Sequence, residues 1–239
     1  MNALLELFAY GPHGWREQLL AAALMTVAVS LCAFATGVGF GILGAWARLS
    51  PRRAIRTVAA GYVTVFRGIP ELLVIYVFYF GGSEALTWVG RLFGGDGPVS
   101  LSGFVIGMLS IGIVSGAYET EVFRGAYLAI PPGIIDAADV CGMGRVLKFR
   151  RIVVPLALRY ALPGMGNVWQ LIIKESALIS VTGLVEITRA VTAGANSTRQ
   201  PFPFYIAGAI LYLAIASASG VLLKRIEARH GARRAPSGE

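Results

Sequence analysis

Residues 18–47 read QLLAAALMTVAVSLCAFATGVGFGILGAWA, and this stretch of 30 residues contains no charged side chain. An α-helix needs about 20 consecutive, mostly apolar residues to cross the hydrocarbon core of a bilayer, so this stretch can span it with some tilt. It is longer than the apolar region of a secretory signal peptide, and its arginine-rich flank follows it. The stretch therefore predicts a first transmembrane helix that is not cleaved.

Four further apolar stretches predict four more membrane-spanning helices. They cover about residues 56–80, 101–118, 162–185 and 204–223. The chain has 239 residues, of which 56% are hydrophobic and 14% charged. A soluble domain carries about a quarter of its residues as charged side chains. The sequence thus predicts an all-α integral membrane protein with about five transmembrane helices.

The basic residues indicate how these helices are oriented. They gather in segments 48–56, 123–160 and 224–239, which five spans place on the same side of the membrane. Short loops rich in Lys and Arg face the cytoplasm. We therefore expect residues 1–18 to be periplasmic, residues 19–223 to form the transmembrane domain and the basic tail to be cytoplasmic. This rule also accounts for the net charge of +8, so we expect no binding to nucleic acid.

The long cytoplasmic loop, about residues 121–160, contains one further predicted helix. Two prolines precede Gly133–Cys141, and Gly142 is a plausible C-terminal stop. The helix is too short and polar to span a bilayer. We expect it to lie at the cytoplasmic face, with Ala137 and Ala138 forming a surface of small residues.

The same loop carries a spaced motif. An acidic residue and two alanines are followed after three residues by a glycine, and after nine more by an isoleucine three positions before a proline: Asp136, Ala137, Ala138, Gly142, Ile152 and Pro155. This pattern resembles the cytoplasmic signature of permeases of binding-protein-dependent ABC importers. In that signature Glu stands at the first position and Leu before the proline, whereas this chain has Asp136 and Val154.

Four other stretches resemble one branch of that family, the polar amino acid permeases of the histidine, lysine-arginine-ornithine and opine type. They are residues 66–73, 115–125, 159–170 and 174–184. The resemblance covers nearly everything from residue 19 to about residue 228.

The resemblance implies the fold, the partners and the substrate class. It implies a type I ABC importer permease that pairs with an identical or related permease, two cytoplasmic ATPase subunits and a periplasmic amino-acid-binding protein. The short loop helix would couple to the ATPase. The chain has no phosphate-binding loop of its own, so ATP and Mg would bind the ATPase and no cofactor this chain. The implied substrate is a basic amino acid (arginine, lysine, ornithine or histidine) or an opine.

Charged residues within the predicted spans are candidates for the substrate pathway, because ionisable groups are costly in hydrocarbon unless they face a cavity or a partner. Polar residues that could line the pathway are Glu71, Glu121, Asn167, Glu175 and Ser180. We interpret Arg67 and Lys174 as structural charges. Arg67 and Glu71 are four residues apart and could pair on one helical face. Structural ion pairs are an equally open interpretation for Glu71 and Glu175. Glu119 and Glu121 could instead pair with arginines such as Arg124 near the cytoplasm.

Two other classes of protein were compared with the importer permease. A secondary transporter would favour inverted repeats with paired broken helices, and we find no such repeat. A membrane-embedded enzyme needs a catalytic constellation, and the sequence carries none. The two cysteines, Cys32 and Cys141, lie in different environments and are not expected to form a disulfide, and no spacing favours a metal site.

Overall fold

The computed structural model describes residues 7–9, 14–92, 97 and 101–230, and within these ranges it contains helices and no strands. In chain order the helices are α2 (Arg16–Arg48), α3 (Arg53–Gly68), α4 (Glu71–Tyr76), the π-helix η1 (Val77–Gly81), α5 (Gly82–Leu92), α6 (Gly103–Leu128), α7 (Pro132–Val140), α8 (Arg145–Lys148), the π-helix η2 (Phe149–Val153), α9 (Val154–Glu175), the 3-10 helix η3 (Ser176–Thr182), α10 (Ile187–Thr198) and α11 (Pro201–His230).

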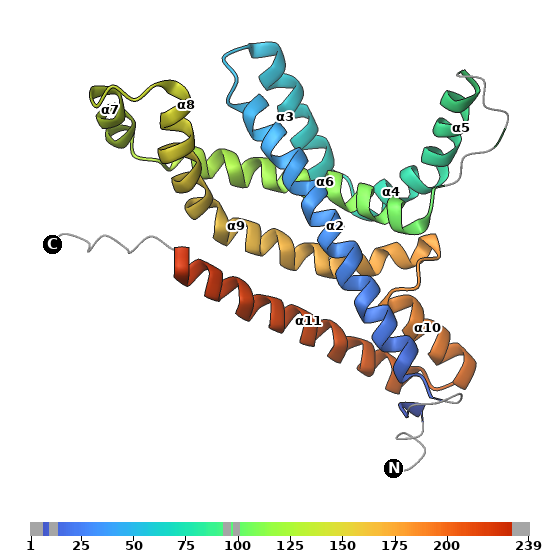
Figure 1. Ribbon diagram of the computed structural model, residues 1–239. Coiled ribbons are helices and arrows are strands. Elements are labelled where there is room, and N and C mark those ends of the chain that lie inside the picture. The colour runs from blue at the N-terminus through green and yellow to red at the C-terminus, as the bar shows by residue number, and fades with distance from the viewer. Residues whose placement is uncertain (1–6, 10–13, 93–96, 98–100, 231–239) are drawn as a thin grey trace.

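The long helices α6, α9 and α11 have similar tilts, with α9 antiparallel to the other two, and α2 crosses them diagonally (Figure 1). The short helices α7 and α8 lie at one end of this bundle, and α10 lies at the other. The turn from α2 into α3 points away from α10. The predicted cytoplasmic loops thus share one part of the molecule.

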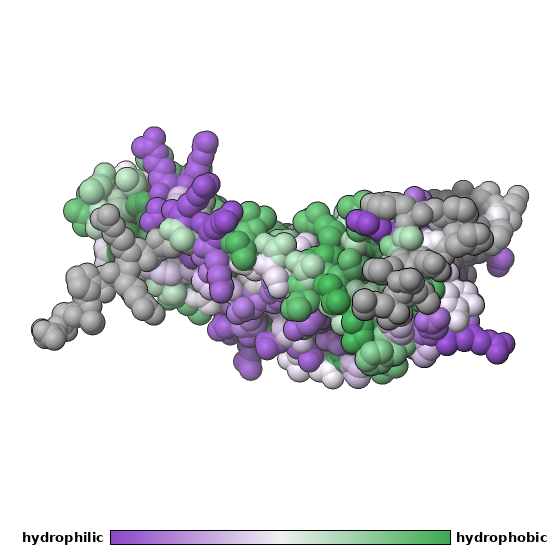
Figure 2. Space-filling view, turned by 90° about the horizontal axis from the view of Figure 1, so that it is seen from below, coloured by the Kyte–Doolittle hydropathy of each residue, from purple (hydrophilic) through white to green (hydrophobic). Residues whose placement is uncertain are grey.

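Among the residues that the structure describes, four helices are long and apolar enough to cross a membrane: Arg16–Arg48, Glu71–Val89, Gly103–Leu128 and Pro201–Arg229. They include the first, third and fifth predicted spans. Figure 2 shows hydrophobic residues spread across the middle of the face that carries α11, and hydrophilic side chains projecting at the end where the C-terminus lies. The apolar helices agree with a multi-pass membrane protein. That the helices cross the membrane five times, and in the expected orientation, stays a prediction.

The second predicted span, residues 56–80, is wrong as a continuous helix. The chain leaves the α-helical conformation after Gly68, because Ile69 and Pro70 are extended, with ψ values of 136° and 130°. A proline disfavours the helical conformation of the residue before it and has no N–H to continue the hydrogen-bond ladder. The apolar helix is therefore Glu71–Val89, and α3 precedes it as a separate amphipathic helix.

The fourth predicted span, residues 162–185, is shifted. Helix α9 begins at Val154 and ends at Glu175, after which the chain tightens into the 3-10 helix η3 and turns at Gly183, whose φ is 87°. Because α9 includes Arg159, Lys174 and Glu175, it is not among the four most apolar helices.

Helices α2 and α6 pack closely through small residues. A Cβ atom on Gly41 would lie 2.6 Å from the Cβ of Glu119, and one on Gly112 would lie 2.8 Å from the Cβ of Thr36. Small residues spaced four apart let helix backbones approach in lipid, where no hydrophobic driving force holds helices together. Gly37 and Gly41 on α2, and Gly112 and Gly116 on α6, have this spacing and lie at the contact.

Candidate functional site

The break between α3 and α4 places two charged residues beside α6. Arg67, in the last turn of α3, lies over the ring of Tyr118, with 5.1 Å between the guanidinium carbon and the ring centroid. Glu71 begins α4 just after Pro70. Arg67 and Glu71 form no ion pair among the described residues, so the predicted pairing of these two is wrong. The extended residues between them remove the helical spacing on which it depended.

Glu175 lies next to this break. It ends α9 and is only 7% exposed, and neither of its carboxylate oxygens accepts a hydrogen bond from the part of the chain that the structure describes. Its carboxyl and that of Glu71 lie within electrostatic reach of each other and of Tyr118. The structure thus brings two predicted pathway residues together. We call Arg67, Glu71, Tyr118 and Glu175 the acidic cluster.

The acidic cluster is suited to bind a cation. Two neighbouring carboxylates in a weakly polar environment repel each other, and a positive charge between them relieves that repulsion. The face of an aromatic ring attracts ammonium and guanidinium groups as well, by about 0.5–2 kcal/mol. Arg67 already uses the ring of Tyr118 in this way. An amino group or guanidinium of a substrate would find the same kinds of partner.

Glu121 lies away from the acidic cluster, in the last part of α6. One oxygen accepts a hydrogen bond from Arg48 Nε at 3.1 Å, and the other accepts one from Arg124 at 3.0 Å. The expected pairing of Glu121 with Arg124 is confirmed, and Glu121 also ties the end of α2 to α6. Its role in the substrate pathway stays a prediction.

The remaining candidates surround α9 and η3. Asn167 is exposed and precedes Glu175 by eight residues, about 12 Å along the helix. Ser180 is half-buried in η3, and its carbonyl accepts a hydrogen bond from Arg189. Lys174 is exposed and forms no ion pair within the described ranges. Of these three residues, Lys174 acts electrostatically on Glu175 of the acidic cluster.

The predicted cytoplasmic helix is α7, displaced by one residue at each end from the expected range. Gly142 stops it as expected, with φ at 72°. The N–H of Gly142 donates to the carbonyl of Asp139, and the N–H of Met143 donates to that of Ala138, which is the Schellman arrangement. Only Gly142 of these residues needs the left-handed conformation, and glycine adopts it without steric cost.

The other motif residues flank α7 and the start of α9. Asp136 and Ala137 are exposed and Ala138 is buried, so the predicted surface of two alanines is wrong for Ala138. Ile152 is half-buried in η2, and Pro155 is exposed in the first turn of α9.

A salt bridge from Lys148 in α8 to Asp139 in α7 holds these two short helices together. The helices η2 and α9 follow α8 without a break.

Sequence reasoning missed two residues of α6. It assigned no role to Tyr118, and the position of Tyr118 within the motif stretch of residues 115–125 was the available signal. It placed Glu119 near arginines, whereas the structure buries Glu119 against Gly41, with no hydrogen-bond partner among the described residues. The packing of α2 against α6 is what buries Glu119, and a tertiary contact of this kind cannot be predicted from the sequence of α6 alone.

A bundle of apolar helices, with a charged cluster at a helix break and a short polar helix at one end, is typical of a membrane transport subunit. The chain belongs to the family described as binding-protein-dependent transport system inner membrane components, whose profile matches residues 37–231.

Known relatives agree with this family. The chain is 54% identical to the octopine transport system permease protein OccQ of Rhizobium radiobacter, over 94% of each chain. It is 37% identical to the histidine/lysine/arginine/ornithine transport system permease protein HisQ of Escherichia coli, over 93% of this chain and 98% of that protein. A solved structure described as an amino acid ABC transporter with histidines has a TM-score of 0.76 and 29% identity, covering 90% of this chain and 95% of that one.

The family fixes the location and the kind of activity. The chain is an inner-membrane component, a transport subunit and not an enzyme, and it is the permease of a binding-protein-dependent ABC importer. Such an importer includes an ATPase and a substrate-binding protein.

Proposed function

We propose that this chain forms half of the translocation pathway of an importer for an opine or a basic amino acid. The observation that carries the proposal is the acidic cluster, where the carboxyls of Glu71 and Glu175 lie near each other beside Tyr118. Opines and basic amino acids carry a positive group that such a cluster can bind. The names of the relatives, octopine and histidine/lysine/arginine/ornithine permeases, support the same substrate class.

The proposed assembly contains a second permease, identical or related, two ATPase subunits and a periplasmic amino-acid-binding protein. ATP and Mg bind the ATPase, and this chain binds no cofactor. Helix α7 contacts the ATPase, with Asp136, Ala137 and Gly142 at the contact, and α8 and η2 carry the movement to α9. The salt bridge from Lys148 to Asp139 supports this route because it joins α7 to α8.

ATP-dependent uptake in proteoliposomes tests this function. The chain is reconstituted with its co-encoded ATPase, binding protein and any sister permease, and labelled arginine, lysine, histidine and octopine are offered. We expect uptake that needs both ATP and the binding protein. Uptake that ignores ATP and follows a proton or sodium gradient would instead indicate a secondary transporter.

Single substitutions test the acidic cluster in the same assay. We expect Glu71→Gln and Glu175→Gln each to raise the substrate concentration for half-maximal uptake about tenfold or more, since a hydrogen bond to a charged group contributes about 1.5–3 kcal/mol. Glu84→Gln, an exposed residue of α5, is the control and should leave uptake unchanged. Wild-type uptake by both cluster variants would contradict the role of the cluster.

A further inference from the structure

An apolar cavity lies apart from the acidic cluster, between the end of α2, the end of α6 and the start of α9. Its volume is about 580 Å³, within the range of about 300–1,000 Å³ that is usual for small-molecule sites. Large side chains from all three elements line it: Ile42, Trp46, Phe123, Tyr127, Val154 and Leu158. We call it the α2–α9 cavity.

The aromatic residues of the α2–α9 cavity fix its depth in the membrane. Trp46 is 69% exposed and Tyr127 is 44% exposed, and both lie within the last turn of their helices or just before it. Trp and Tyr gather at the boundary between hydrocarbon and headgroups. Since the turns that follow these helices are the predicted cytoplasmic loops, the predicted orientation places the cavity at the level of the inner leaflet.

Unpaired arginines stand at the cytoplasmic edge of the α2–α9 cavity. Arg150 directly follows the lining residue Phe149 and precedes the lining residue Val154 by four positions, about one turn of the π-helix η2. Arg151 is its neighbour, and Arg52 follows the lining residue Pro51 directly.

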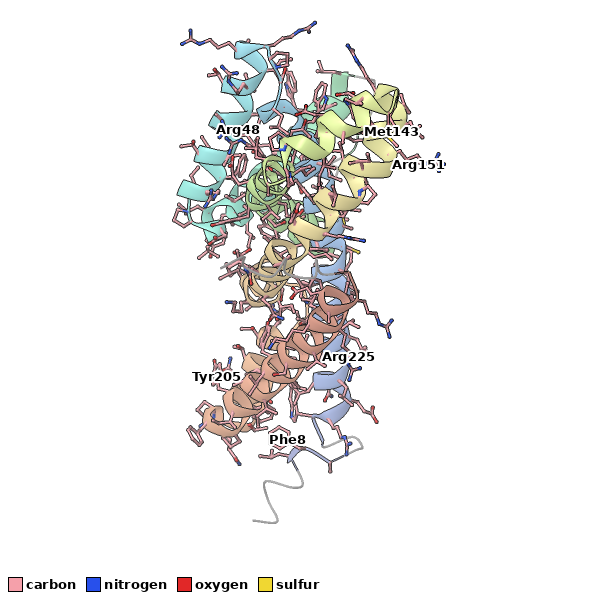
Figure 3. All side chains as sticks on the ribbon, turned by 90° about the vertical axis from the view of Figure 1, so that its left-hand side faces the viewer. Phe8, Arg48, Met143, Arg151, Tyr205 and Arg225 are labelled. Atoms are coloured by element: carbon pink, nitrogen blue, oxygen red, sulfur yellow. The ribbon has the colours of Figure 1, made fainter. Side chains whose placement is uncertain are left out.

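All three arginines are exposed, and none forms an ion pair within the described residues. Figure 3 shows Arg151 projecting outward, while Arg225 lies apart from it on α11. The cavity therefore joins an apolar interior to a positively charged edge.

We propose that the α2–α9 cavity binds an anionic phospholipid of the inner leaflet. An acyl chain occupies the apolar interior between Trp46 and Leu158, and the phosphate headgroup lies against Arg150, Arg151 and Arg52. Basic pockets between helices on the cytoplasmic side bind anionic headgroups by this combination of charge and apolar contact. The paired arginine Arg48 takes no part, because its guanidinium already donates to Glu121.

Native mass spectrometry of the purified importer complex, stripped of lipid in detergent, tests this site. Phosphatidylglycerol and phosphatidylcholine of equal chain length are titrated separately, and bound lipids are counted by mass. We expect Arg150→Gln/Arg151→Gln to lower the affinity for phosphatidylglycerol about 30-fold and to leave that for phosphatidylcholine unchanged. Ala157→Trp places a large side chain in the cavity and should weaken the binding of both lipids.

The matched control is Arg225→Gln/Arg229→Gln, which removes two exposed arginines from α11 and should not change binding. Equal loss in this control, or wild-type binding in Arg150→Gln/Arg151→Gln, would overturn the proposal. Displacement of phosphatidylglycerol by inorganic phosphate would show an anion site without a lipid chain. A change in the subunit count of the complex in Ala157→Trp would show that a protein partner fills the cavity.

Discussion

Two glycine residues of this chain are constrained for different reasons, one by its backbone conformation and one by its neighbours, and the reason determines the effect of a substitution. Gly142 has a positive φ of 72° and open space around it, so its conformation is the constraint. Gly41 has ordinary helical geometry, but the Glu119 side chain and backbone lie against it. In the first case any side chain strains the backbone, and in the second the side chain itself has no room.

Gly142→Ala tests the first kind of glycine. A residue with a Cβ pays about 1–2 kcal/mol in the left-handed conformation, so we expect the end of α7 to unwind. Transport per ATP hydrolysed should fall, which is measured by uptake and phosphate release on the same proteoliposomes.

The control for this change is Gly133→Ala, because Gly133 lies within α7, is exposed and has no neighbour within 4 Å. The same ratio of transport to ATP hydrolysis in both variants would show that the conformation of the turn after α7 does not matter for transport.

Gly41→Leu tests the second kind. The new side chain would begin 2.6 Å from the Cβ of Glu119, and overpacking of a well-packed core costs about 1–3 kcal/mol. We expect a lower midpoint of thermal unfolding of the purified complex. Gly39→Leu is the matched control, because Gly39 lies on the same helix in open space. Equal midpoints for the two variants would contradict the close contact of α2 and α6.

The elements differ in how far the sequence predicts them. The first, third and fifth spans follow from uncharged stretches alone, because length and hydropathy are sufficient in a bilayer. The end of α7 follows from Gly142. The second span fails because Arg67, Pro70 and Glu71 look like interruptions within a helix, whereas they mark its division into two.

Glu71 and Glu175 are 104 positions apart in the sequence, so only tertiary packing brings their carboxyls together. The sequence identified both as candidates from their cost in hydrocarbon but could not predict that they are neighbours. It could not find Tyr118 for the same reason, since a tyrosine in a span is ordinary until its contact with Arg67 is known.

Pro70→Ala tests the division of α3 from α4. Alanine supplies the missing N–H and favours a continuous helix, which would rotate Glu71 relative to Glu175. We expect uptake to fall about tenfold or more, because small misplacements of binding groups are costly. Pro201→Ala, at the first position of α11, is the control. Unchanged uptake by Pro70→Ala would show that the break is not needed for transport.

The molecule as a whole carries its basic loops at the end where α7 and α8 lie. Orientation in the membrane can be tested with the native cysteines, since Cys141 is exposed directly after α7 and Cys32 is half-buried in α2. In cells that express the permease without its ATPase, we expect an impermeant maleimide to label Cys141 from the cytoplasmic side only. Gln200→Cys, between α10 and α11, should be labelled from the periplasm. Labelling of both from one side would overturn the predicted topology.

The glycine-lined contact between α2 and α6 has a consequence for how the gene can change over time. Leu24 and Leu31, which lie away from this contact on α2, are more than half exposed, and any apolar side chain satisfies a lipid environment there. Gly37, Gly41 and Gly44 each have an atom of α6 within 3 Å of where a Cβ would stand. Random substitutions in α2 should therefore be tolerated on the lipid-facing side and eliminated on the side that contacts α6. In a collection of functional variants, the invariant positions of α2 should recur with the period of the helix.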